Sequence, residues 1–178
     1  MTTTQKLARA QVGTALRLRP LRLDDEAAFV AGHQAMAADE FTFGLGFEPG
    51  MPWPAYLKVL ADQRAGAALP PDFVPATFLV AEVAGEIVGR SSIRHTLNDF
   101  LAREGGHIGY GVLPQFRRRG YATEILRQSL VIARAAGVGR VLLFCDDDNA
   151  GSAAVIEACG GRLESVVRTA PKRRYWIG

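Results

Sequence analysis

The chain has 178 residues, of which 48% are hydrophobic and 22% charged, and 21 lysines and arginines against 18 acidic residues give it a net charge of +3. This length and composition predict one folded domain and exclude a disordered, collagen-like or disulfide-dependent protein. The small positive charge suits a polyanionic small molecule and argues against a protein that wraps nucleic acid.

Two cysteines, Cys145 and Cys159, lie far apart in the sequence. Their spacing excludes a Cys-x-x-Cys redox centre and a zinc site of four cysteines. A disulfide is allowed but not required, and we expect two small buried thiols. Residues 1–13 lack the apolar core of a signal peptide, and no apolar run is long enough to span a membrane. We therefore expect a cytoplasmic protein without a membrane or metal partner.

The first half of the chain is irregular. Residues 1–14 are polar without apolar periodicity, so we expect a flexible segment there and a domain over 15–178. Residues 16–23 alternate apolar and basic side chains, as an edge strand does, and Asp24 and Asp25 then begin a helix. Residues 41–75 are rich in glycine, proline and aromatics, with one short helical pattern, which is typical of a substrate-binding region.

The second half alternates strands with two helices. The first helix is amphipathic, with Ile125, Leu126 and Leu130 on its apolar face, and Asn149 caps the second. The run 140–145 is continuously apolar, as in a buried parallel strand. This order predicts an α/β (α+β) domain with a mixed sheet. The strand patterns cover residues 77–83, 87–95, 107–113, 140–145, 163–167 and 174–177. The turn at 84–86 joins the first two of them in a predicted β-hairpin.

A short basic loop separates the strand that ends at Val112 from the amphipathic helix. The N-terminus of a helix offers free N–H groups and the positive end of a dipole, and Arg117–Arg119 add three guanidiniums. Gly120 removes the Cβ that would keep a phosphate from the backbone. The loop therefore predicts a phosphate or pyrophosphate site, and the alternative is a solvated, basic helix start.

The spacing Arg117-x-x-Gly120-x-Ala122 resembles the acetyl-CoA motif of the GNAT N-acetyltransferase superfamily, Gln/Arg-x-x-Gly-x-Gly/Ala. The resemblance extends over the chain from about Leu16. The runs 92–98 and 106–111 look like those of a subgroup of predicted acetyltransferases. The resemblance implies a mixed, mostly antiparallel sheet of about seven strands flanked by about four helices, with the fourth and fifth strands splayed into a V.

The resemblance also implies a reaction, in which a small-molecule or peptide amine attacks acetyl-CoA directly in a ternary complex. The pantetheine arm of acetyl-CoA, the co-substrate, would lie between the splayed strands, and a homodimer is allowed. Asn149 and Ser152 have structural alternatives as a helix cap and a packing residue. The expected cofactor contacts are Val112, Leu113, Arg117, Arg118, Arg119, Gly120, Tyr121, Ala122, Thr123, Asn149 and Ser152.

The two expected catalytic residues are Tyr110 and His107. Many family members carry a tyrosine that protonates the leaving thiolate, but Ile156 holds that position here. Tyr110 or bulk water is the substitute acid that we expect. His107 is the ionisable group of this strand with a pKa near neutrality, so it is the candidate base, and its alternative is a structural strand histidine.

Two further functions compete with acetyl transfer. The missing tyrosine favours an acyl-CoA sensor that binds without turnover. A nucleic-acid binder would use Arg117–Arg119 with Lys172–Arg174, but aromatics do not alternate with these basic residues. For the acceptor, Asp39 and the acids and aromatics near it suggest a cationic or aromatic amine. Those neighbours are Glu40, Phe41, Phe43, Phe47, Glu48, Trp53 and Tyr56. Two further residues, His95 and Asn98, could line the same cleft.

Overall fold

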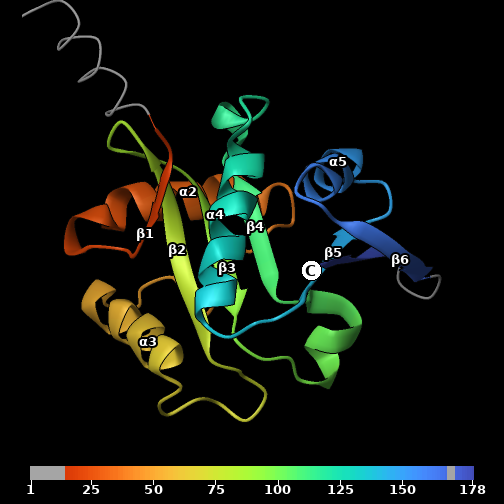
Figure 1. The fold of residues 1–178 in the computed structure, drawn as a ribbon. Coiled ribbons are helices and arrows are strands. Elements are labelled where there is room, and N and C mark those ends of the chain that lie inside the picture. The colour runs from red at the N-terminus through yellow and green to blue at the C-terminus, as the bar shows by residue number, and fades with distance from the viewer. Residues whose placement is uncertain (1–14, 168–170) are drawn as a thin grey trace, which may run out of the picture.

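The computed structural model describes residues 15–167 and 171–178, so the expected flexible segment 1–14 lies outside the described residues (Figure 1). The α-helices of this part are α2 (Glu26–Ala37), α3 (Trp53–Ala65), α4 (Tyr121–Ala135) and α5 (Ala150–Ala158). Short helical turns cover Leu23–Asp25 (η1), Leu101–Gly105 (η2) and Pro114–Phe116 (η3). The strands are β1 (Arg17–Arg19), β2 (Ala76–Val83), β3 (Glu86–Arg94), β4 (Ile108–Val112), β5 (Val141–Asp146), β6 (Arg162–Val167) and β7 (Lys172–Ile177).

The strands form two sheets. Their orders are β1-β2-β3-β4 and β5-β7-β6, and every ladder within them is antiparallel. The expected split between the fourth and fifth strands is confirmed. The expected parallel pairing of residues 140–145 is wrong, because β5 forms its ladder with β7 and meets β4 only at its beginning. Sequence periodicity showed that β5 is buried and could not show which strand lies beside it.

The β2–β3 hairpin forms where the sequence predicts it. Ala84 and Gly85 connect the strands with φ angles of 52° and 86°. Two consecutive residues at positive φ match the twist of the flanking strands in a two-residue hairpin. This hairpin is the centre of the first sheet, with β1 on one side and β4 on the other.

Helices cover both faces of the first sheet. Phe78 and Val80 of β2 pack against Phe29 and other side chains of α2 and α3, whereas Leu79 packs with Leu126 of α4 on the opposite face. Figure 1 shows α4 crossing in front of β3 and β4, with α2 behind the sheet. The predicted apolar face of α4 is confirmed, since Ile125, Leu126, Ser129, Leu130 and Ala133 are its buried residues.

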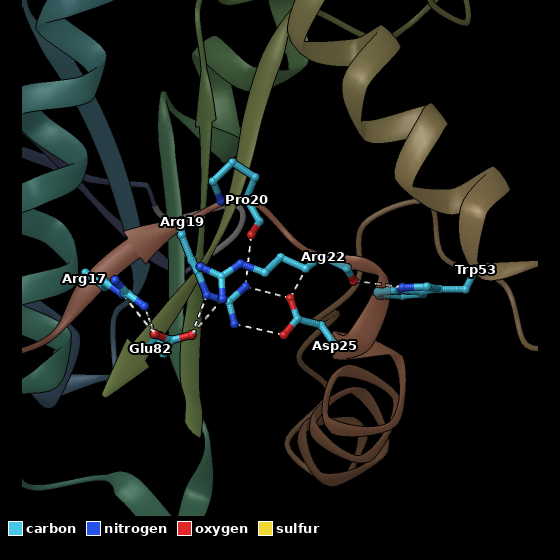
Figure 2. Close-up of polar contacts among 7 residues, drawn as sticks. All are labelled: Arg17, Arg19, Pro20, Arg22, Asp25, Trp53 and Glu82. Carbon is cyan, nitrogen blue, oxygen red and sulfur yellow. Dashed lines mark hydrogen bonds and ion pairs between the residues drawn. The ribbon is translucent and has the colours of Figure 1, made fainter. Parts of the chain in front are cut away.

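A buried ion-pair network fastens β1 to β2 and to the start of α2 (Figure 2). Glu82 accepts hydrogen bonds from Arg17 and Arg19, and Arg19 also binds both carboxylate oxygens of Asp25. The Arg22 N–H donates to Asp25 at 2.7 Å, and the indole of Trp53 donates to the Arg22 carbonyl at 3.0 Å. These contacts hold the short edge strand β1, whose ladder covers only three residues.

Candidate functional site

The loop between β4 and α4 turns at Gly120, which caps α4 with φ 79°. A Cβ built on Gly120 would meet nothing within 4 Å, so the left-handed backbone is what requires glycine here. Among the described residues, the N–H groups from Arg118 to Thr123 have no backbone acceptor. The loop thus presents unpaired donors at the positive end of a 15-residue helix.

The three arginines of the loop have different surroundings. Arg117 donates to the Val112 carbonyl at 3.1 Å and pairs with Asp39 at 2.6 Å, so its side chain ties the loop to the end of α2. Arg119 donates to the Gln115 carbonyl at 3.2 Å and lies over the Phe116 ring. Arg118 is exposed and has no side-chain partner within the described part of the chain. Of the three expected phosphate ligands, Arg118 is the least constrained.

The two sheets touch at the beginning of β4 and β5. The His107 N–H donates to the Leu142 carbonyl at 2.7 Å, and Nδ1 of His107 accepts the Leu142 N–H at 2.9 Å. Burial, and then the charge of Arg94, lower the pKa of His107 below its usual value. The imidazole is therefore neutral, with its proton on Nε2, and it closes the V at one end. This geometry favours the structural alternative for His107, and the base role stays a prediction.

Beyond this contact, toward Val112, one edge of β4 faces the split between the two sheets. The Leu113 N–H is paired with the Val88 carbonyl, and the His107 carbonyl accepts the Arg94 N–H, both toward β3. Because backbone direction alternates along a strand, the polar groups of Tyr110 and Val112 point the other way. The Val112 carbonyl already accepts from Arg117. An extended arm could therefore pair with Tyr110 and the Val112 N–H, and not with the N–H of Leu113.

Tyr110 reaches across the split to α5. Its hydroxyl lies 3.0 Å from Oγ of Ser152, and burial raises the pKa of Tyr110 to about 12. Asn149 caps α5 by accepting the Ser152 N–H at 2.9 Å, so its predicted cap role is confirmed. The structure thus brings Tyr110 from one side of the split together with Asn149 and Ser152 from the other.

Ile156 is fully buried in the core that α4 and α5 share with the second sheet. The side chain at the position of the usual tyrosine is therefore a core-packing residue in this chain. Among the described tyrosines, Tyr110 is the one whose hydroxyl lies within hydrogen-bond distance of Ser152. Cys145 is buried and Cys159 half-buried, and both are free thiols. Burial raises the pKa of both thiols, which suits packing residues.

The opposite face of β4 carries residues that the sequence reasoning missed. Gly109 and Gly111 leave room there for large side chains from elsewhere. A Cβ on Gly109 would lie 3.3 Å from Nη1 of Arg94, and a Cβ on Gly111 would lie 2.6 Å from the Phe41 ring. Arg90 packs beside them and donates to the Gly109 carbonyl at 2.8 Å. The pair of glycines next to two strand arginines was the available signal.

The residues that the sequence suggested for binding the acceptor have different surroundings in the structure. Phe43, Trp53 and Tyr56 are buried in the core beneath α2 and α3, so the interpretation that they recognise an acceptor is wrong. Asp39 is paired with Arg117. His95 lies 2.8 Å from the Thr77 hydroxyl, and Asn98 caps η2 through the Leu101 N–H.

Three further observations on the described residues concern metal ions, membranes and nucleic acid as partners. Residues 15–167 and 171–178 contain no group of three His, Cys, Asp or Glu side chains placed to hold a metal ion. No described helix combines the length and apolarity of a membrane span. Lys172, Arg173 and Arg174 each lie beside a carboxylate, so this half of the basic set in the nucleic-acid hypothesis is paired with acidic side chains.

Similar folds occur in solved structures at low sequence identity. An acetyltransferase from Agrobacterium tumefaciens matches with a TM-score of 0.63 and 22% identity, over 92% of this chain and 90% of its own. RimJ of Mycobacterium smegmatis, in complex with CoA disulfide, matches at 0.65 and 24%, over 93% and 81%. The putative acetyltransferase yncA of Salmonella typhimurium, with its cofactor acetyl-CoA, matches at 0.61 and 16%, over 92% and 93%. No curated protein sequence matches this chain.

The described residues thus form a split antiparallel sheet, with the unpaired N–H groups of the α4 start at the open end of the split. The model of the acetyltransferase (GNAT) domain matches residues 15–162 of this chain. The chain therefore belongs to the GNAT acetyltransferases, and acetyl-CoA-dependent acyl transfer is its general activity.

Proposed function

We propose that this protein transfers the acetyl group of acetyl-CoA to a primary amine, which attacks the thioester directly in a ternary complex. The observation that carries the proposal is the loop 118–123, whose N–H groups are unpaired at the mouth of the split between β4 and β5. A pyrophosphate bound there would leave the pantetheine arm to follow the free edge of β4 toward Tyr110.

In this proposal each part of the chain has a defined task. The loop N–H groups and Arg118 hold the pyrophosphate, and Arg117 keeps the loop in place through Asp39 and Val112. The backbone of Tyr110 and the Val112 N–H pair with the arm. The amine nitrogen forms the new C–N bond with the thioester carbon. When the tetrahedral intermediate collapses, its C–S bond breaks, Tyr110 donates its proton to the leaving thiolate, and the surplus proton on the nitrogen passes to a base, which is His107 or a chain of water molecules.

Two properties of Tyr110 bear on its role as the acid. Its raised pKa keeps the phenol protonated over the working pH range, and the same shift makes it a weaker proton donor than a free tyrosine. Ser152, at 3.0 Å, can return or relay a proton through its own hydroxyl. His107 is the candidate base only in a state in which its Nδ1 has released the Leu142 N–H.

The competing proposal is an acyl-CoA sensor, and the burial of Ile156 in the core is the observation that favours it. The two functions are separated by thiol release from acetyl-CoA in the presence of a broad panel of primary amines. Acetyl transfer predicts amine-dependent release of CoA thiol above the rate without amine. A sensor would bind acetyl-CoA and release no thiol with any amine. The domain limits and the homodimer stay predictions.

A further inference from the structure

Arg94 occupies an unusual place beside the proposed reaction site. It ends β3, and its guanidinium lies against the Gly109 backbone of β4, next to Tyr110. Among the residues that the structure describes, its Nη1 reaches only the carbonyls of Gly105 and Gly106, at 3.4 and 3.5 Å. Both distances exceed those of ordinary hydrogen bonds, so its donors are poorly used.

Arg94 also has no counter-charge. Within the described residues, no Asp or Glu forms an ion pair with Arg94 or with Arg90. Burial lowers the pKa of Arg94, and its charged neighbour is Arg90, whose pKa the charge of Arg94 also lowers. A mostly buried cation without an anion is costly, and the structure offers no internal group that offsets it.

Unlike Arg94, Arg90 has close hydrogen-bond acceptors for its guanidinium. It is 4% exposed and donates to the carbonyls of Thr42, Phe43 and Gly109 at 2.6, 3.1 and 2.8 Å. Its guanidinium also lies 4.4 Å from the centre of the Phe41 ring. Arg90 therefore fastens the 41–43 segment to β4 and adds positive charge beside Arg94. Arg94 is left as the group with donors for a ligand.

Arg94 is half-buried, so part of its side chain is open to solvent. Its guanidinium and the Phe41 ring lie over Gly109 and Gly111 on the face of β4 opposite Tyr110. An acceptor on this face would have its amine toward the split and any neighbouring group against Arg94. The planar guanidinium fork matches carboxylate and phosphate oxygens.

We propose that the acceptor is an amine that carries an anionic group a few atoms from its nitrogen, as an α-amino acid does, and that Arg94 binds this group. The inference rests on the proposed function, since it assigns the acceptor class of that same site. It departs from the cationic or aromatic acceptor that the sequence suggested. Arg94 selects the acceptor by its charge, and acetyl-CoA binds without it.

The first experiment compares matched acceptors in the thiol-release assay. Glycine, methionine, phenylalanine and glutamate are each compared with their C-terminal amides, and phosphoethanolamine with ethanolamine, which separates a carboxylate from a phosphate as the preferred anion. The proposal predicts that the anionic member of at least one pair has a kcat/KM higher by about 10–100-fold, as a charge-assisted hydrogen bond allows. Neutral partners used equally well in every pair would overturn it.

The variant Arg94→Met should remove this preference mainly by raising KM for the anionic acceptor, with the affinity for CoA unchanged. Arg94→Lys keeps the charge without the fork and should fall between the two. Arg134→Met, an exposed arginine at the end of α4, is the control and should change neither value. If Arg94→Met lowers kcat for every acceptor alike, the group stabilises the reacting oxygen, and the inference is wrong.

A second readout needs no turnover. N-acetyl amino acids, the products of the proposed reaction, are added to the CoA-loaded protein, and the shift in its melting temperature is compared with that of their amides. A stabilisation limited to the acids, absent from Arg94→Met, supports the anion site even if no amine is acetylated and the proposed function fails. If amines are acetylated without any preference for acids in either readout, the proposed function stands and this inference falls.

Discussion

The hydroxyls of Tyr110 on β4 and Ser152 on α5 lie 3.0 Å apart, so one hydrogen bond crosses the split between the two sheets. The Tyr110 ring is partly buried against two of the core clusters, which restricts its position. The expected acid and an expected cofactor contact, 42 residues apart in sequence, thus meet where the sulfur of a bound thioester is proposed to lie.

Tyr110→Phe tests the acid. Because burial keeps this phenol protonated below its pKa of about 12, its loss should remove proton donation at any working pH. We expect turnover to fall by about 10²–10⁴-fold with CoA affinity unchanged, as is typical for general acid catalysis. Steady-state kinetics and calorimetry measure the two quantities. Ser152→Ala, which keeps the phenol, is the matched control and should lose far less. Normal turnover in Tyr110→Phe would mean that the thiolate leaves unassisted.

His107→Gln separates the structural role of His107 from the base role. The pKa of His107 is lowered, so protonation opposes folding, and this part of the stability is present above about pH 6.5 and lost as the pH falls below it. We expect the free energy of unfolding of the variant to be lower by about 0.5–1.5 kcal/mol at pH 8, because one buried hydrogen bond is lost. As the pH falls below about 6.5, the stability of the variant should decline less than that of the wild type. Thermal melts across pH measure both.

Turnover of the same variant decides the catalytic question. A structural His107 predicts nearly normal kcat at pH 8 in the variant. A drop of about 10²–10⁴-fold with CoA binding intact would instead assign His107 as the base, with an acidic limb below pH 6.5 because its pKa is lowered.

Glu82→Gln tests the network around β1. Burial alone would raise the pKa of Glu82, but the hydrogen bonds from Arg17 and Arg19 outweigh it and lower that pKa. Removing the charge leaves buried Arg19 with Asp25 alone, so we expect a loss of about 3–5 kcal/mol at pH 7. Asp62→Asn, in an exposed pair with Lys58, should cost about 1 kcal/mol or less. Urea titrations of both variants measure these costs.

The same network predicts an acid dependence. The pKa of Asp25 is also lowered, first by its hydrogen bonds with Arg19. Carboxyls with lowered pKa stabilise the fold above their ordinary values and lose this effect as the pH falls through the folded pKa. Wild-type stability should therefore decline below about pH 4, and less steeply in Glu82→Gln. Parallel slopes in the two proteins would contradict the account.

Ile156→Tyr tests the loss of the family tyrosine. Ile156 has no exposed surface, and a Cβ on Gly161 would already lie 2.4 Å from its Cγ2. The larger ring should cost about 1–3 kcal/mol of stability and bring no gain in turnover. Val131→Tyr, at an exposed position of α4, is the control for adding a ring. A faster enzyme of unchanged stability would show that the hydroxyl reaches the sulfur.

Local patterns in the sequence were enough for most of the fold. The turn at Ala84-Gly85, the apolar face of α4 and the cap at Asn149 depend on neighbours within a few residues, and all three are confirmed. The V between β4 and β5 came from the resemblance. The pairing of β5 with β7 was missed, because it is decided by which distant strand covers its edge, and periodicity carries no such information.

The candidate site was predictable only in part for the same reason. Gly120 and the free helix start follow from the loop, but Arg117 finds Asp39 across 78 residues of sequence. The three consecutive arginines are equivalent in the sequence, but in the fold Arg117 and Arg119 have different partners, and Arg118 has none among the described residues. Arg94 lies against Gly109 only after β3 and β4 have paired, so its role depends on the register of two strands.

The most direct test of the account is a calorimetric titration of CoA into wild-type protein, Gly120→Glu and Gly137→Glu. Both glycines have positive φ, at 79° and 90°, both have open space around a built Cβ, and they lie at opposite ends of α4. Both variants should therefore pay a similar backbone cost, about 1–2 kcal/mol, and remain folded. Gly137→Glu should bind CoA like the wild type, and Gly120→Glu, with a carboxylate at the proposed pyrophosphate site, should not bind it. Equal CoA affinity in the two folded variants would contradict the account.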